Sequence, residues 1–261
     1  MSAWDVLLHF ERSHRAHAPV DFRRWKRASQ RALRALFPGS DVRVLDATAG
    51  LGDHTVNLAE LGFLVTAGDA SQVAREATLA ACTAAGLEVP VLDVRWETLG
   101  TSHPSAFDLI FHDAIHWIEY EAVMHEVLQS LRAALRPGGA LAFFFADFRD
   151  PNPGAGERVR LWDLQNMARH ELAYREPYED GHVTKTIVRV PVNDVVQEHH
   201  LFVIEAPEKE PRLESAMLTR IYRWDFAAMQ EIALRAGFSR LEGHLFENDK
   251  GHPTTMCLAY V

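Results

Sequence analysis

Short apolar runs alternate with stretches of helical spacing along the first 150 residues. The apolar runs have the length of buried strands, and they lie at 42–47, 63–67, 89–94, 107–111 and 140–146. The stretches between them place apolar residues every three or four positions, and several end at a glycine, which commonly terminates a helix. Strands that alternate with helices at this pace predict a parallel sheet with helices on both faces.

The pattern changes after residue 150. The stretch 151–156 is rich in Pro and Gly and indicates a linker, and 158–173 has the spacing of a short helix. Residues 183–190 and 195–205 then have the character of strands with no helix between them. This arrangement predicts an antiparallel hairpin.

The alternating pattern resumes near the C-terminus with strands at 217–222, 240–246 and 254–261 and a helix at 225–236. The expected fold class is therefore α/β, with a Rossmann-like, doubly wound, seven-stranded sheet and an antiparallel lid insertion after the fifth strand. In order, the expected parts are the N-terminal helices with the cofactor-binding core at 1–150, the lid at 151–215, and the rest of the core sheet at 216–261.

Composition and charge narrow the class of protein. The 261 residues carry 27 Lys and Arg against 36 Asp and Glu, and the net charge of −9 disfavours a surface that binds nucleic acid. Cys82 and Cys257 lie among small or apolar residues, which indicates buried thiols rather than a disulfide. No apolar run approaches the roughly 20 residues of a membrane helix, and the charged N-terminus is unlike a signal peptide. We expect a cytoplasmic protein that acts on a small molecule, binds neither membrane nor nucleic acid, and is compatible with a homo-oligomer.

A glycine-containing loop follows the first predicted strand. The loop 46–52 has the sequence Asp-Ala-Thr-Ala-Gly-Leu-Gly, whose glycines let a ligand approach the backbone beside a helix N-terminus. Asp69 follows the second strand, where a carboxylate can accept hydrogen bonds from ribose hydroxyls. Both features fit NAD as well as S-adenosylmethionine (SAM). A dinucleotide fingerprint has a third glycine, however, where this chain has Thr55.

The order of these motifs resembles the class I SAM-dependent methyltransferases. Pro137-Gly138-Gly139 stands before the fifth strand and after 107–110, as the corresponding motifs of that class do. The segments 44–52, 62–66 and 69–71 are similar to the glycine and sarcosine N-methyltransferase group. This resemblance implies SAM as cofactor and a lid inserted after the fifth strand.

The resemblance also implies where the adenine of SAM lies. The group has an Asn-Trp pair after the third strand, and this chain has Arg95 and Trp96 at that place. Trp96 is therefore expected to pack on the adenine, with Asp93 or Val94 near its edge.

The same group clamps the SAM carboxylate with an Arg on an N-terminal helix, since a guanidinium binds a carboxylate through two hydrogen bonds. The helical segment Trp4–Leu36 offers Arg15 as the best match, with Arg23 or Arg24 next. The complete expected cofactor site comprises Arg15, Asp46, Thr48, Gly50, Gly52, Asp69, Ala70, Asp93, Arg95, Trp96 and His112.

Three ionisable residues follow the fourth strand, at the edge where the methyl group of SAM should emerge. They are His112, Asp113 and His116, and the glycine-methylating group has a Gly-Asn-Ser-like run instead. We expect Asp113 to accept a hydrogen bond from an amine and His112 or His116 to act as a general base, so all three are candidate catalytic residues. No metal is expected, although a cation held by these residues and Asp147 is an alternative.

Four further residues are candidates for binding the acceptor. Arg149 follows the fifth strand, about two positions later than the Arg that holds a substrate carboxylate in the glycine-methylating group. Tyr222, His199 and His200 lie in or beside the expected lid. Because neighbouring residues of a strand point to opposite faces, at least one of the two histidines must point outward.

These observations predict a SAM-dependent methyltransferase that acts on the nitrogen of an amino acid or amine. The alternatives are an O- or imidazole-N-methyltransferase with a His base, transfer of the aminocarboxypropyl arm of SAM, and an inactive partner subunit with a SAM-binding fold. Intact Gly50, Gly52 and Asp69 argue against the inactive subunit.

Overall fold

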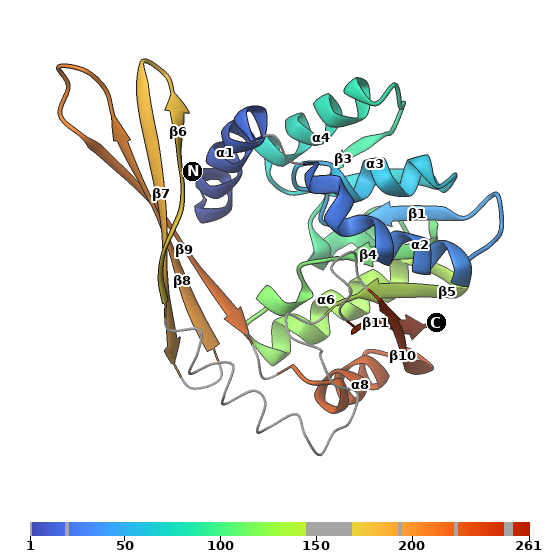
Figure 1. Cartoon of the computed structure of the whole chain (residues 1–261). Coiled ribbons are helices and arrows are strands. Elements are labelled where there is room, and N and C mark those ends of the chain that lie inside the picture. The colour runs from blue at the N-terminus through green and yellow to red at the C-terminus, as the bar shows by residue number, and fades with distance from the viewer. Residues whose placement is uncertain (1, 19–20, 145–168, 193–194, 222–223, 248–252) are drawn as a thin grey trace. The chain divides into compact units, whose positions relative to one another are not determined.

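The structure is a computed structural model of the chain (Figure 1), and it describes residues 2–18, 21–144, 169–192, 195–221, 224–247 and 253–261. The chain divides into two compact units. The core unit comprises Asp21–Pro153 and Trp224–Val261, and the insertion unit comprises Met1–Val20 and Gly154–Arg223. Within the described ranges, no helix combines the length and the apolar character needed to cross a membrane.

The core unit is built on a seven-stranded sheet in the order β10-β11-β5-β4-β1-β2-β3. The five strands from β5 to β3 are parallel, and β10 and β11 add an antiparallel edge, which confirms the expected α/β fold class. Strand order reverses between β1 and β4, and sheets of this kind bind ligands at the carboxyl ends of the strands on either side of such a switch point. The strands are β1 (Arg43–Asp46), β2 (Leu64–Asp69), β3 (Val91–Asp93), β4 (Phe107–His112), β5 (Leu135–Phe143), β10 (Arg240–Glu247) and β11 (Pro253–Tyr260).

The helices of the core unit precede the first strand or lie between the strands along the chain. Ser71 caps α4 by accepting a hydrogen bond from the Ala74 amide at 3.2 Å, as the sequence predicts. The helices of the core unit that the structure describes are η1 (Phe22–Lys26), α2 (Arg27–Leu36), α3 (Asp53–Glu60), α4 (Gln72–Ala84), η2 (Trp96–Thr98), α5 (Leu99–Ser102), η3 (Ile115–Trp117), α6 (Glu121–Ala134) and α8 (Phe226–Arg235).

The N-terminal segment forms separate helices, as expected. The first, α1 (Ala3–His17), ends at Ala18, whose backbone is extended with φ −79° and ψ 130°. Ala18 precedes Pro19, and the ring of a proline disfavours the helical conformation of the residue before it. The chain forms helix again only at η1 and α2.

The insertion unit holds a four-stranded antiparallel sheet in the order β6-β7-β8-β9. Its central pair, β7 (Gly181–Val192) and β8 (Val195–Glu205), confirms the predicted hairpin. β6 (Arg169–Tyr178) occupies the end of the helix expected at 158–173, so that part of the expectation is wrong, and the remainder lies outside the described residues. β9 (Arg212–Ile221) pairs with β8, whereas we expected its second half to rejoin the core sheet.

Both errors arise from the kinds of residue that these strands bury. Tyr174 and Glu176 of β6 are half-buried and buried, so its inward positions are polar and no apolar alternation marks a strand. Among the β9 side chains that the structure describes, only those of Ala216 and Leu218 are buried, and Met217 between them is exposed. A helix follows β9 along the chain, which imitates the strand-helix alternation of the core.

Helix α1 packs on this four-stranded sheet. Phe10 is 3% exposed, and its ring stacks on Phe202 with the centroids 4.1 Å apart. The His14 Nδ1 atom lies 2.6 Å from the Glu176 carboxylate, and Lys185 pairs with the carboxylate of a further α1 residue, Glu11. These contacts group α1 with the insertion unit, although the boundary expected at residue 150 placed it with the core.

Phe10→Ala should lower the free energy of unfolding by about 3–5 kcal/mol, because it deletes a buried ring and leaves a cavity over Phe202. Urea unfolding followed by circular dichroism measures the change. Leu213→Ala on β9 is the matched control, since Leu213 is 63% exposed and its truncation should change stability by less than about 0.5 kcal/mol. Equal effects of the two substitutions would contradict the packing of α1 on the sheet.

Candidate functional site

The loop between β1 and α3 turns sharply at two glycines. Gly50 has φ +54° and Gly52 has φ +86°, which is the left-handed region that favours glycine. A Cβ atom on Gly52 would lie 2.9 Å from the Cβ of Ala81 on α4, so a side chain there would collide as well. At Gly50 the nearest atom to such a Cβ is a carbonyl oxygen at 3.7 Å, which leaves the backbone open to a ligand.

The buried carboxylate of Asp46 supports this turn from beneath. It accepts hydrogen bonds from the Thr55 hydroxyl at 2.7 Å and from the Thr48 amide at 3.3 Å. Thr55 occupies the place of the third glycine of a dinucleotide fingerprint, and its hydroxyl explains why a threonine is useful there. Burial raises the pKa of the Asp46 carboxyl, while the imidazole of His54 and the hydroxyl of Thr55 oppose the rise.

Asp69, at the end of β2, joins the second strand to the glycine loop. Its carboxylate accepts hydrogen bonds from the Gly50 amide at 3.1 Å and the Ser71 amide at 2.9 Å. The side chain remains half-buried, and the neighbouring Ala70 is exposed. An acceptor-only group therefore stands beside the open backbone of the loop, where it suits the hydroxyls of a ribose.

Trp96 and His112 form an aromatic pair beside the end of β1. The indole Nε1 of Trp96 donates to the Ala47 carbonyl at 2.8 Å, and the ring lies 4.3 Å from the imidazole of His112, tilted by 56°. His112 is buried at the end of β4, and its Nδ1 accepts a hydrogen bond from the Ala114 amide at 3.3 Å. The Trp96 ring is half-buried, which suits a platform for a flat base.

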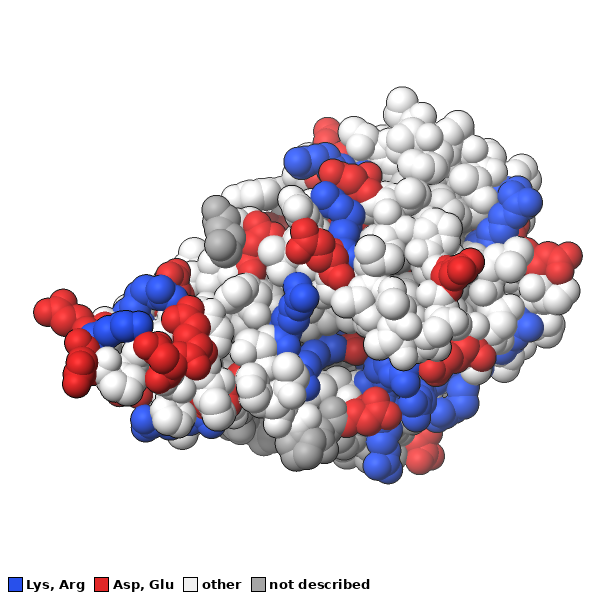
Figure 2. Space-filling model, turned by 90° about the horizontal axis from the view of Figure 1, so that it is seen from above, with Lys and Arg blue, Asp and Glu red and all other residues white. Residues whose placement is uncertain are grey.

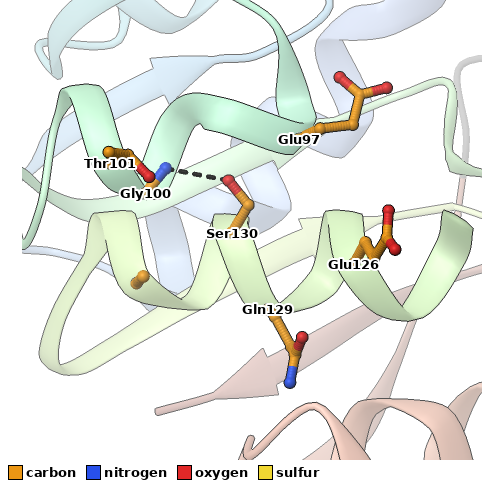
Figure 3. A pocket seen from close by; sticks show the side chains of 7 residues that line it. Glu97, Gly100, Thr101, Glu126, Gln129 and Ser130 are labelled. Carbon is orange, nitrogen blue, oxygen red and sulfur yellow. Dashed lines mark hydrogen bonds between the residues drawn. The ribbon is translucent and has the colours of Figure 1, made fainter.

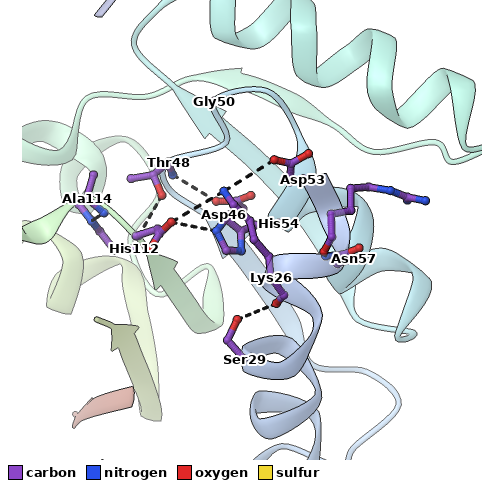
Figure 4. Close-up of polar contacts among 12 residues, drawn as sticks. Lys26, Ser29, Asp46, Thr48, Gly50, Asp53, His54, Asn57, His112 and Ala114 are labelled. Atoms are coloured by element: carbon purple, nitrogen blue, oxygen red, sulfur yellow. Dashed lines mark hydrogen bonds and ion pairs between the residues drawn. The ribbon is translucent and has the colours of Figure 1, made fainter. Parts of the chain in front are cut away.

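Figure 4 shows a polar network at the carboxyl ends of β1 and β4 that includes Thr48 and His54. Asp113, which follows His112, belongs to this network. Its amide donates to the Thr48 hydroxyl at 3.0 Å, and its carboxylate lies 2.9 Å from the His54 Nε2 atom. The Lys26 ammonium lies 4.0 Å from the Asp113 carboxylate and 3.8 Å from that of Asp53. The network thus places a half-exposed carboxylate next to the glycine loop and supports it from two sides.

Sequence reasoning missed the partners of Asp113. Lys26 lies on η1, far from Asp113 along the chain, and no short motif links the two. His54 carried a weak signal, because it is the second residue of the helix that follows the glycine loop, where its side chain starts beside the site. Its pairing with Asp113 spans 59 residues and depends on the strand order of the sheet.

Two of the remaining expected cofactor residues lie on or directly after β3, and a third belongs to the insertion unit. Asp93, the last residue of β3, lies opposite Asp69 in the sheet register and pairs with Arg75 at 3.4 Å, and Arg95 is exposed. Arg15 lies on α1 in the insertion unit, so its role as a carboxylate clamp stays a prediction. The alternative Arg23 pairs with Glu60 at 2.8 Å.

The candidate substrate residues are only partly placed. His199 and His200 lie on β8, where His200 is buried and His199 half-buried, in line with their opposite directions. Arg149, Tyr222 and Asp147 lie outside the described residues, as does the side chain of His116. Among the side chains that the structure does describe, no three His, Cys, Asp or Glu residues gather closely enough to hold a metal ion.

A separate pocket of about 400 Å³ lies between α5 and α6 (Figure 3). The two helices can approach closely because residue 100 is a glycine. A Cβ atom there would lie 2.5 Å from the Ser130 carbonyl oxygen. The Gly100 amide also donates to the Ser130 hydroxyl at 2.9 Å. Glu97 and Glu126 line the same pocket, and the contacts identify it as the packing seam of two helices.

Residues 44–139, which run from β1 into β5, match a protein family described as a methyltransferase domain. Curated protein sequences contain no match to this chain. The matched residues include the glycine loop, Asp69 and Trp96.

Solved structures of methyltransferases share the fold over almost the whole chain. A sugar N-methyltransferase from Streptoalloteichus sp ATCC 53650 has a TM-score of 0.67 and 16% identity, over 96% of this chain and 92% of that one. A SAM-bound amino pentose methyltransferase from Micromonospora echinaspora has a TM-score of 0.62 and 18% identity, over 96% of this chain and 95% of that one. The 1,6-didemethyltoxoflavin-N1-methyltransferase of Burkholderia thailandensis, with S-adenosylhomocysteine bound, has a TM-score of 0.53 and 16% identity, over 98% of this chain and 87% of that one. At these identities the likeness establishes the fold.

Residues 44–139 of the core unit are thus similar to a methyltransferase domain, and the chain has the fold of these solved methyltransferases. Two of the solved structures contain SAM or S-adenosylhomocysteine. The resemblance to the glycine and sarcosine group remains a prediction.

Asp46→Asn should remove a pH dependence of stability. Because burial raises the pKa of Asp46 in the folded chain, its contribution to stability is complete below the usual value of 3.8 and is lost as the pH rises through the raised pKa. The free energy of unfolding of the wild type, minus that of Asp46→Asn, should fall across this window and then stay level. Urea unfolding at pH values from about 4 to about 8 measures the difference. A difference that rises with pH would contradict the direction of the shift.

Proposed function

We propose that the chain transfers a methyl group from SAM to the nitrogen of a small polar amine, with Asp113 as the residue that meets the acceptor. The observation that carries the proposal is the half-exposed carboxylate of Asp113 after β4, which contacts His54 while the Asp113 amide donates to the Thr48 hydroxyl beside the glycine loop. Ionised, this group only accepts hydrogen bonds, so it suits an N–H donor.

The residues of the core unit fit SAM. The open backbone at Gly50 would receive the amino acid part, Asp69 would accept hydrogen bonds from the ribose, and Trp96 would pack on the adenine. His112 contacts Trp96 and is buried, so we propose that it supports the cofactor site rather than the acceptor. When bound, SAM supplies a methyl group on a positively charged sulfur.

The acceptor needs orientation and a place for its proton. Methyl transfer is an in-line displacement in which a C–N bond forms while a C–S bond breaks, so holding the nitrogen close and aligned supplies much of the rate. An amine attacks with its lone pair, so an acceptor that arrives as an ammonium must first give up one proton. The Asp113 carboxylate would orient the amine through an N–H bond and take this proton. Nearby Lys26, at 4.0 Å, would partly balance the negative charge before transfer.

The structure favours Asp113 over His112 as the group that meets the acceptor. The Nδ1 atom of His112 accepts a hydrogen bond from a backbone amide, and the ring is buried against Trp96. A base needs to reach the proton that it removes. An oxygen or imidazole acceptor with His112 as base therefore has less support than an amine at Asp113.

Charge on the surface is consistent with a small acceptor. Acidic and basic side chains are interspersed over the face drawn in Figure 2, and neither sign covers a broad area. Together with the net charge of −9, this pattern supports a small molecule over a nucleic acid as the methyl acceptor.

Isothermal titration calorimetry should detect binding of SAM and of S-adenosylhomocysteine, and Asp69→Ala should weaken it by about 1–3 kcal/mol through lost ribose hydrogen bonds. Asp41→Ala, an exposed carboxylate in the loop before β1, is the control and should leave the affinity unchanged. Tighter binding of NAD than of SAM would overturn the cofactor assignment.

Asp113→Asn should lower the kcat of methyl transfer by about 100-fold or more, because the amide cannot take the proton of the amine, while the affinity for SAM stays close to that of the wild type. A panel of amino acids, amines and amino sugars with radiolabelled SAM identifies the acceptor for this test. Asp108→Asn, at the start of the same strand, is the matched control, since Asp108 pairs with the Arg43 amide and Arg136 instead. Turnover by Asp113→Asn at the wild-type rate would rule out this role.

A further inference from the structure

A chain of hydrogen bonds behind Asp113 has a direction that a single backbone group determines. The carbonyl of Arg23 is an acceptor only, and it lies 3.0 Å from one end of the Asn57 side-chain amide. That end must therefore be the NH₂ group. The same NH₂ group lies 3.3 Å from the side chain of Gln30, so the atom that faces it there must be the carbonyl oxygen.

The orientation of Gln30 in turn determines the tautomer of His54. With its oxygen turned to Asn57, Gln30 presents its NH₂ group to the Nδ1 atom of His54, and the two are paired. The Nδ1 atom must then accept, so the ring proton of neutral His54 sits on Nε2. Nε2 is the atom that lies 2.9 Å from the Asp113 carboxylate. His54 is thus an N–H donor to Asp113.

The chain is buried where it sets this direction. Gln30 is 0% exposed, Asn57 2% and His54 5%. Water therefore cannot exchange freely with the amide groups, and reversing one of them would leave two acceptors or two donors facing each other in the interior. Such a mismatch costs about 1–3 kcal/mol per buried group, which is enough to keep the order fixed.

We propose that His54 is a positioning residue for methyl transfer, locked as the Nε2–H tautomer by Asn57 and Gln30 so that it holds the carboxylate of Asp113 toward the acceptor. This inference rests on the proposed role of Asp113. The backbone of Asp113 is held by the Thr48 hydroxyl at 3.0 Å, and the bond from His54 adds the second point that fixes the orientation of the side chain. With its backbone and its side chain both held, Asp113 keeps its carboxylate oxygens in line with the acceptor. Misplacement by about 1 Å can lower a rate 100-fold.

The kinetic test compares two substitutions of His54. His54→Phe keeps a buried ring but removes the donor, and kcat should fall by about 10-fold or more while the affinity for SAM and the KM for SAM stay unchanged. His54→Gln should recover most of that loss, because its amide offers an acceptor for Gln30 and a donor for Asp113 in the same order. Ser130→Ala is the control for a mere loss of stability, since Ser130 bonds a backbone amide in the α5–α6 seam.

Equal turnover by His54→Phe and the wild type would overturn the positioning role. Failure of His54→Gln to recover any rate lost in a folded His54→Phe would overturn it as well, because a donor in the same order would then be without effect. If no acceptor is methylated by the wild type, the proposed function fails, and the hydrogen-bonded chain is then judged by spectroscopy alone.

Spectroscopy tests the tautomer without any substrate. In ¹⁵N NMR of the full chain, the signals of His54 are those that disappear in His54→Gln, and they should show a protonated Nε2 and an unprotonated Nδ1. Gln30→Glu replaces the donor with an acceptor, so Nδ1 of His54 must gain a proton and its signal should move to the protonated range. A wild-type His54 that already carries its proton on Nδ1 would overturn the proposed chain.

Discussion

The candidate site depends on one buried carboxylate, that of Asp46 at the end of β1. It holds the Thr48 amide and the Thr55 hydroxyl, and these two bonds fix where the chain leaves the sheet and where α3 begins. The Thr48 hydroxyl then receives the amide of Asp113, so the order imposed at β1 reaches the end of β4. A hydrocarbon at Asp46 would fill the same space but would leave the loop without its internal partners.

Such an arrangement places unusually many polar groups beneath a glycine loop. Asp46, Asp53 and His54 are all buried, within eight positions of one another along the chain. Buried charges are tolerated only when they are paired or when their pKa values shift. Here Lys26 lies 3.8 Å from Asp53, and burial raises the pKa of Asp46. The site is therefore stiff where it supports the ligand, and its polar interior is what allows the loop above it to remain glycine-rich.

Much of the core was predictable because its signals are local. Buried parallel strands produce continuous apolar runs, and the loop 46–52 and Asp69 follow such runs directly, so topology alone brings them to one edge. The hairpin of β7 and β8 was predictable for the same reason, since β8 alternates along its length between buried and half-buried residues. Local patterns were sufficient wherever the partner of a residue was the sheet itself.

The parts that escaped prediction depend on partners distant in the sequence. Strand β6 buries Glu176, which is stable there because His14 of α1 lies 2.6 Å away. When the contact with α1 is not known, a glutamate at that position argues against a buried strand. The tautomer of His54 is a similar case, because it follows from a carbonyl of η1 through two side-chain amides. Periodicity describes which face of an element is apolar, and it carries no information on which polar group will satisfy another.

The match to the methyltransferase family falls within one of the two units of the chain. The family match, residues 44–139, lies entirely within the core unit, and it contains the glycine loop, Asp69, Trp96 and Asp113. The solved structures that share the fold match nearly the whole chain at 16–18% identity, so the likeness includes residues of both units. A methyl donor common to the class requires a constant core. An acceptor that differs between enzymes requires groups besides those that bind the donor, and we propose Asp113 as one of them in this chain.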